Sequence, residues 1–188
     1  MKISKNSGFT LIELVVVIVI LGVLAVTAAP RFLNYQRDAH LSVADGAFAS
    51  FEAGVTMYHD KWLTEGEPTG IVDYGEGDVY PSTTGFPISV NQPPLVPNNN
   101  DNIQIRGGDC VSLWNAMVDT DLAIRSQHSG SGAVLPSEEQ IVSWYTSSNE
   151  CYYYYYTPSF NISEPLPILY YSPLTGETRQ AMEMASSS

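Results

Sequence analysis

The chain has 188 residues, of which 44% are hydrophobic and 15% are charged, so it is long enough for one domain and too apolar to be disordered. Its 8 Lys and Arg residues stand against 20 Asp and Glu residues, which gives a formal net charge of −12. Binding to nucleic acid or to an anionic lipid surface normally requires a basic face, so composition argues against both kinds of direct partner.

The first predicted element is an apolar helix from Phe9 to Ala29, in which Glu13 is the one charged residue. Its 21 residues would extend roughly 32 Å, enough to cross the hydrocarbon core of a bilayer. Lys2 and Lys5 precede the helix, and the positive-inside rule places them on the cytoplasmic side. Burying an unpaired carboxylate in hydrocarbon is costly, so Glu13 needs either a partner or a function.

Three kinds of N-terminal signal fit this pattern in part. An ordinary secretory signal would be cleaved before Ala29, after the small residues of Val26-Thr27-Ala28. An uncleaved signal anchor would keep the helix, and a prepilin signal would be cleaved ahead of it. The secretory interpretation explains neither Glu13 within the apolar run nor the short polar leader that ends at Gly8.

Residues 2–13 read KISKNSGFTLIE, and the six positions from Gly8 to Glu13 resemble the processing signal of type IV pilins and pseudopilins. The resemblance is close over residues 1–62. It implies a leader peptide at residues 1–8, cleavage after Gly8 by a prepilin peptidase, and N-methylation of Phe9. Glycine suits such a cleavage site because it has no side chain to obstruct the peptidase.

The same resemblance implies that residues 9–29 are retained as a transmembrane and assembly helix, followed by an exported globular domain at residues 30–188. It also gives Glu13 a role in subunit assembly. In the family this carboxylate is neutralised by the positive amino terminus of a neighbouring subunit, which would favour one axial register. The alternative is that Glu13 snorkels to the nearby cytoplasmic interface.

An amphipathic helix is predicted over residues 30–62. Pro30 would kink the chain there, or the apolar helix would end at Ala29. Beyond Pro30, apolar residues recur at alternating spacings of three and four, which predicts one buried helix face. We expect this face to pack on the chain's own sheet; a two-chain coiled coil is the alternative. The apolar positions are Leu41, Ala44, Phe48, Phe51, Val55, Tyr58 and Trp62.

Residues 63–109 are rich in Gly, Pro, Asn and acidic residues, which predicts a connecting loop with little room for long elements. In a pilin this region would be a variable surface. Asp73, Glu76 and Asp78 are weak candidates for calcium ligands. They lack the spacing of a known calcium loop, so a solvated acidic surface is the favoured interpretation.

Residues 110–188 are predicted to form the sheet region. Cys110–Val118 reads as a short helix, and the segments IVSWYT, CYYYYYT, PILYYS and ETRQAM are β-prone, with hairpin turn residues in SPLTGE. We expect an antiparallel sheet of three to five strands on the amphipathic helix, and thus a pilin-like α+β fold. The tyrosines at 152–156 would alternate between faces, one packed on the helix and the other available for a subunit contact or adhesion.

Cys110 and Cys151 are the two cysteines, and we expect them to pair because an exported domain lies in an oxidising compartment. Pilins similarly carry a disulfide in the C-terminal part of the domain. The tryptophan spacing and the YYSPLTGE segment also resemble pilins of the mannose-sensitive haemagglutinin kind.

Catalytic patterns are missing from the sequence: His40, His59 and His128 lack metal-ligand spacing, and no HExxH, CxxC or GxSxG motif occurs. We therefore predict a structural subunit without a cofactor, made as a precursor in the bacterial inner membrane and assembled into an extracellular type IV pilus for adhesion, motility or DNA uptake. Its expected partners are other pilin subunits, the prepilin peptidase, the inner membrane and the pilus assembly platform. The alternatives are a periplasmic pseudopilin of a type II secretion system and a secreted soluble binding protein.

Overall fold

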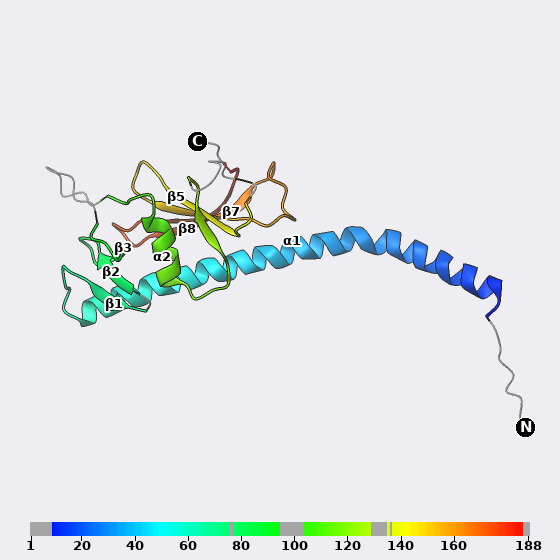
Figure 1. The fold of residues 1–188 in the computed structure, drawn as a ribbon, viewed down its shortest axis with the longest axis horizontal. Coiled ribbons are helices and arrows are strands. Elements are labelled where there is room, and N and C mark those ends of the chain that lie inside the picture. The colour runs from blue at the N-terminus through cyan, green and yellow to red at the C-terminus, as the bar shows by residue number, and fades with distance from the viewer. Residues whose placement is uncertain (1–8, 76, 95–103, 129–134, 136, 186–188) are drawn as a thin grey trace, which may run out of the picture. The chain divides into compact units, whose positions relative to one another are not determined.

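The computed structural model describes residues 9–75, 77–94, 104–128, 135 and 137–185, without the side chains of residues 29, 30, 33 and 34. The described residues form two helices and eight strands (Figure 1). The chain divides into two compact units between Ala39 and His40, and the first helix contributes to both. The elements are α1 (Leu11–Thr64), β1 (Val72–Tyr74), β2 (Gly77–Pro81), β3 (Pro87–Val90), α2 (Asp109–Met117), β4 (Ile124–Ser126), β5 (Ile141–Tyr145), β6 (Cys151–Tyr155), β7 (Leu166–Tyr171) and β8 (Thr178–Glu183).

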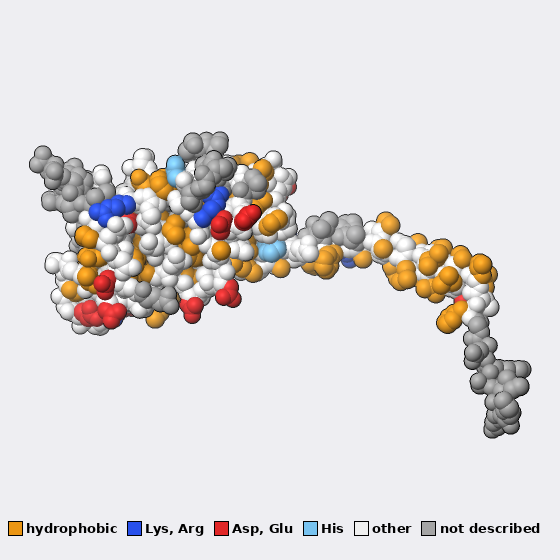
Figure 2. All heavy atoms as spheres, viewed as in Figure 1, with side chains coloured by type: hydrophobic (Ala, Val, Ile, Leu, Met, Phe, Trp, Pro, Cys, Tyr) orange, Lys and Arg blue, Asp and Glu red, His pale blue; other side chains and the backbone are white. Residues whose placement is uncertain are grey.

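In the first unit, the segment Leu11–Ala28 of α1 is long and apolar enough to cross a membrane, and its side chains are exposed. Hydrophobic side chains, orange in Figure 2, cover this segment. The helix continues through Pro30, so the alternative of a helix end at Ala29 is wrong. Exposed apolar side chains over a bilayer-spanning length are what a membrane helix requires.

In the second unit, α1 buries the predicted apolar face. The first and last positions of the pattern, Leu41 and Trp62, are partly buried and pack against the core. The fully buried positions between them are Ala44, Phe48, Phe51, Val55 and Tyr58. The part of α1 drawn in cyan in Figure 1 lies along the five-stranded sheet. The prediction that this face packs on the chain's own sheet is therefore confirmed.

The C-terminal end of α1 is fixed by its own backbone. Gly66 has φ of 85°, a conformation that glycine adopts without strain. Its N–H donates to the carbonyl of Leu63 at 3.2 Å, and the N–H of Glu67 donates to the carbonyl of Trp62 at 3.0 Å. These two bonds form a Schellman motif, which satisfies carbonyls that the last helical turn leaves without partners.

The larger sheet has the strand order β4-β5-β6-β7-β8. Its last four strands are antiparallel neighbours, in the segments where strands were predicted. β4 adds a short edge strand that pairs parallel to β5. The predicted α+β fold, a long helix against a largely antiparallel sheet, is thus confirmed.

The predicted connecting loop at residues 63–109 contains a second sheet that sequence reasoning missed. It is antiparallel, with the order β1-β2-β3. Val72, Val79 and Ile88 contribute one fully buried side chain each, and the Tyr58 hydroxyl donates to the Val79 carbonyl at 3.1 Å. Strands of three to five residues fit between the turns of a Gly- and Pro-rich segment, where a longer element would not.

The disulfide between Cys110 and Cys151 is present and joins α2 to β6, with Cα atoms 5.5 Å apart. Beside it lies an aromatic cluster on one face of the large sheet. The Phe51 ring on α1 lies 5.0 Å from that of Tyr153 on β6, 5.4 Å from that of Tyr171 on β7, and 5.6 Å from that of Trp114 on α2, measured between centroids. One helix, the short helix and two strands therefore share one core.

Candidate functional site

The predicted processing and assembly residues lie at the start of α1. Gly8, the residue before the predicted cleavage, is outside the described residues. Phe9 and Thr10 directly precede α1, and Glu13 lies in its first turn. All three are exposed, with Phe9 92% accessible, so the described residues leave this end open to a partner.

Thr10 and Glu13 hold each other in a capping box. The Thr10 backbone N–H and hydroxyl both donate to Glu13 Oε2, at 2.9 Å and 2.8 Å. In return, the Glu13 N–H donates to Thr10 Oγ1 at 3.3 Å. A Thr followed three residues later by Glu is the sequence pattern for this motif, which satisfies donors that the first helical turn leaves without partners.

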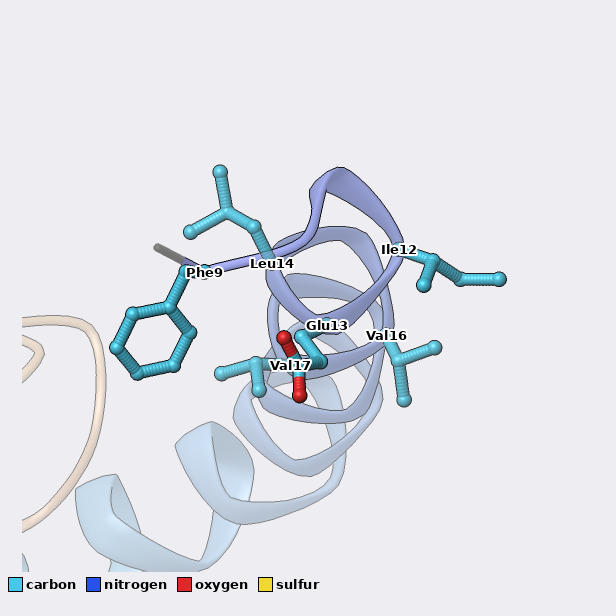
Figure 3. A pocket seen from close by; sticks show the side chains of 6 residues that line it. All are labelled: Phe9, Ile12, Glu13, Leu14, Val16 and Val17. Carbon is cyan, nitrogen blue, oxygen red and sulfur yellow. The ribbon is translucent and has the colours of Figure 1, made fainter. Parts of the chain in front are cut away.

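The turn that carries Glu13 forms a shallow apolar groove, shown in Figure 3. Glu13 and Val17 are four residues apart on α1, so they share one side of the helix, and Figure 3 shows the Glu13 carboxylate beside Val17. Phe9, which precedes the helix, also lines the groove. Ile12 and Val16 point to another side. The groove thus presents one anionic group among hydrocarbon side chains, an arrangement that favours a cation delivered by an apolar partner.

The weak calcium candidates do not form a site among the described residues. Asp73 on β1 and Asp78 on β2 are cross-strand neighbours and both are exposed, while Glu76 lies outside the described residues. The described part of the chain holds no group of three or more His, Cys, Asp or Glu residues able to bind a metal. Two exposed carboxylates give fewer ligands than calcium takes.

The three histidines have aromatic neighbours. His40 Nδ1 lies 3.3 Å from the Tyr155 hydroxyl. The His59 ring stacks on Phe86 with centroids 4.1 Å apart, and the His128 ring lies 4.1 Å from that of Trp144. These contacts are packing and hydrogen-bonding contacts, so none of the three is placed as a member of a catalytic pair among the described residues.

Two features were missed in the sequence. The capping partner Thr10 could have been found, because the T-x-x-E spacing is local and visible. The second feature is the extension of the predicted aromatic face of residues 152–156 into a row across the large sheet, in which Trp144 pairs with Tyr152 and Tyr152 with Tyr170. That row depends on strand register, which composition does not specify.

Comparison with known proteins points to the same end of the chain. Residues 3–29 match the family model of the prokaryotic N-terminal methylation motif. The chain is 41% identical over 58 residues to the type II secretion system core protein G of Pseudomonas aeruginosa, which covers 31% of this chain and 41% of that protein. It is 39% identical over 71 residues to the type IV major pilin protein PilE1 of Neisseria gonorrhoeae, covering 36% and 43% of the two chains.

A third relative, the type IV major pilin protein PilA of Myxococcus xanthus, is 48% identical over 40 residues, or 21% of this chain and 18% of that protein. The chain thus spans less than half the length of these curated relatives. No solved structure matches it significantly. The chain thus carries the prepilin methylation motif and is homologous, over its N-terminal third, to type IV pilins and to a type II secretion pseudopilin.

Proposed function

We propose that this pilin-like chain is a structural subunit of a type IV pilus. A prepilin peptidase cuts after Gly8, and the new amino terminus at Phe9 is N-methylated. The helix that follows anchors the subunit in the bacterial inner membrane and then forms part of the filament core. The observation that carries this proposal is the exposed apolar segment Leu11–Ala28, which bears Glu13 in its first turn and continues into the helix of the folded head.

In this proposal the Glu13 carboxylate receives the positive amino terminus of a neighbouring subunit. A paired charge is tolerable in an apolar filament core, whereas an unpaired one is costly, so the pair favours one axial register. The other partners are the assembly platform and further pilin subunits. The extracellular filament serves adhesion, motility or DNA uptake, and the subunit itself performs no catalysis.

The test is the mass of the N-terminal peptide of the protein purified from its native host. We expect a peptide that begins with N-methylated Phe9, and a Gly8→Leu variant that retains the leader. A peptide that begins with unmodified Ala29 would mean conventional signal cleavage and a secreted soluble protein. Retention of Met1 in the mature protein would mean an uncleaved anchor, and either result would refute the proposal.

A pseudopilin of a type II secretion system is the second candidate, and the match to core protein G favours it. Both candidates predict the same N-terminal peptide, so a genetic test separates them. We expect loss of this chain to remove surface pili and to leave the secreted proteins of the culture unchanged. Intact pili together with lost secretion would assign the chain to the secretion pseudopilus.

A further inference from the structure

The large sheet presents a row of aromatic side chains on the face away from α1. Trp144 on β5, Tyr152 on β6 and Tyr170 on β7 are directly paired across the strands, and Arg179 on β8 continues the row. Tyr153, the next residue on β6, contacts Phe51 of α1, so the row lies on the opposite face. We propose that the groove along this row binds a neutral saccharide.

The aromatic rings of the row offer flat apolar surfaces, except that the Arg179 guanidinium lies over the Tyr170 ring. Those of Trp144, Tyr152 and Tyr170 are half-buried, which fixes them while leaving part of each accessible. The Tyr152 and Tyr170 rings have centroids 6.3 Å apart, and the Trp144 ring lies 4.9 Å from that of Tyr145. A pyranose ring presents C–H groups on its faces, and these pack on aromatic rings because the ring faces carry partial negative charge.

Polar groups lie next to these rings. The buried Gln127 accepts a hydrogen bond from the Tyr152 hydroxyl, and its backbone N–H donates to the Ser143 carbonyl at 2.9 Å, so the amide is held in place. The hydroxyl-bearing residues Thr146 and Ser147 also line the groove. The hydroxyls of Thr146, Ser147 and Tyr152 can bond the hydroxyls of a sugar, while the buried Gln127 orients the Tyr152 hydroxyl. A few fixed polar groups beside an apolar wall are typical of a small-ligand site.

Charge selects among ligand classes. Among the described residues that line the groove there is no Asp, Glu, Lys or Arg, and His128 supplies the one imidazole. The cation next to the row, Arg179, lies 3.5 Å from the Glu183 carboxylate, which offsets its charge, and the chain as a whole carries a net charge of −12, so the groove does not favour anions. A cationic ligand is also disfavoured, because the Arg179 guanidinium lies 4.0 Å from the centroid of the Tyr170 ring and takes that cation–π position. A neutral, hydroxyl-rich ligand remains.

The ionisation of the tyrosines agrees with a neutral groove. Burial, with a smaller effect from Tyr154, raises the pKa of Tyr152 to about 12, so its hydroxyl stays protonated at physiological pH. Burial and the bond from the Tyr170 hydroxyl to Glu183, 2.7 Å long, raise the pKa of Tyr170 as well. Both hydroxyls therefore keep their protons, and the groove gains no charge from them.

The test uses the full chain in micelles of a detergent without a sugar headgroup, so the result does not depend on filament assembly. Calorimetric titration is made with cellohexaose, chitohexaose, mannohexaose and, as a charged comparison, hexagalacturonate. We expect saturable binding of at least one neutral hexasaccharide and none of hexagalacturonate. Absence of saturable binding to all three neutral probes by folded protein would overturn the proposal, and so would preferential binding of the anion.

Matched variants locate the site. Trp144→Ala and Tyr152→Ala should each weaken binding about tenfold, because each removes one stacking surface. Trp144→Phe should retain most of the affinity. The control is Tyr80→Ala, which removes a half-buried aromatic side chain from β2 of the other sheet and should leave the affinity unchanged. Equal affinity in the Trp144→Ala variant would refute the site. If the variant instead loses filament incorporation while the parent chain binds no saccharide, the aromatic row is a contact between subunits.

Discussion

At the scale of residues, Glu13 has two competing sets of partners. In the single chain its carboxylate accepts bonds from the Thr10 N–H and hydroxyl. In a filament, the proposed partner is the amine of another subunit, which would form a stronger, charge-assisted bond. The capping box therefore keeps Glu13 satisfied before assembly, and Thr10 acts as a residue that positions the carboxylate.

Replacing Thr10 with Val should fray the first turn of α1. Valine keeps the branched shape but removes the hydroxyl that bonds Glu13, and losing an N-cap costs about 0.5–2 kcal/mol. Amide hydrogen exchange at residues 11–14 in micelles should accelerate, while Thr10→Ser should exchange like the parent chain. Identical exchange in the valine variant would show that the capping box does not stabilise the turn.

Asp109 provides a pH-dependent contribution to stability. Burial raises the pKa of this carboxyl above its ordinary value of 3.8, although bonds from the Arg106 backbone N–H, at 2.6 Å, and from the Gln92 amide, at 3.1 Å, oppose the rise. The pKa of Asp109 is higher in the folded chain than in the unfolded chain. Its stabilising contribution is therefore fully present below pH 3.8 and is lost as the pH rises through the pKa of the folded chain.

The Asp109→Asn variant isolates this contribution because an amide does not titrate. The free energy of unfolding of the parent chain, relative to the variant, should decrease between about pH 3 and pH 7. Urea unfolding at several pH values measures this difference, and the other carboxylates cancel in it. A relative stability that increases with pH would contradict the raised pKa.

At the scale of elements, local sequence patterns predicted the helices and strands that are long enough to show a repeating pattern. The spacing of apolar residues located the buried face of α1, and the β-branched and aromatic runs located β5 to β8. β1 and β4 have three residues each, which are too few to show a repeating pattern. The parallel pairing of β4 with β5 is set by tertiary contacts. These elements depend on neighbours that a local pattern does not contain.

Contact between α1 and α2 depends on a glycine. A Cβ atom added to Gly54 would lie 2.3 Å from the Met117 carbonyl oxygen at the end of α2, whereas one added to Gly46 would meet nothing within 4 Å. Gly54→Ala should therefore lower the free energy of unfolding by about 1–3 kcal/mol despite the better helix propensity of alanine.

Gly46→Ala is the matched control on the same helix. It should raise stability by up to about 1 kcal/mol, because it adds a methyl group without a clash. Chemical unfolding of the two variants in the same micelles compares them directly. Equal stability of the two alanine variants would show that the close approach of α1 and α2 does not constrain residue 54.

At the scale of the whole molecule, the disulfide ties α2 to the sheet across a sequence separation of 41 residues. In the chain-entropy model such a link stabilises by about 4 kcal/mol, because it restricts the unfolded chain. The Cys110→Ala, Cys151→Ala double variant should lose stability of that order in urea unfolding, and reduction of the parent chain should match it. A loss below about 1 kcal/mol would place the stability of the folded unit in the aromatic core instead.

The proposed assembly into a filament requires the whole molecule, since the anchor, the Glu13 charge and the folded head would act together. Glu13→Val should be processed normally, because the change lies beyond the cleavage site, yet it should enter filaments poorly because the neighbour's amine loses its counter-charge. Glu13→Gln keeps a hydrogen-bond acceptor without the charge, so an equal defect in both variants would assign the effect to charge. Pili sheared from cells that co-express tagged parent and variant chains measure the incorporated fraction, and normal incorporation of Glu13→Val would rule out the pairing role.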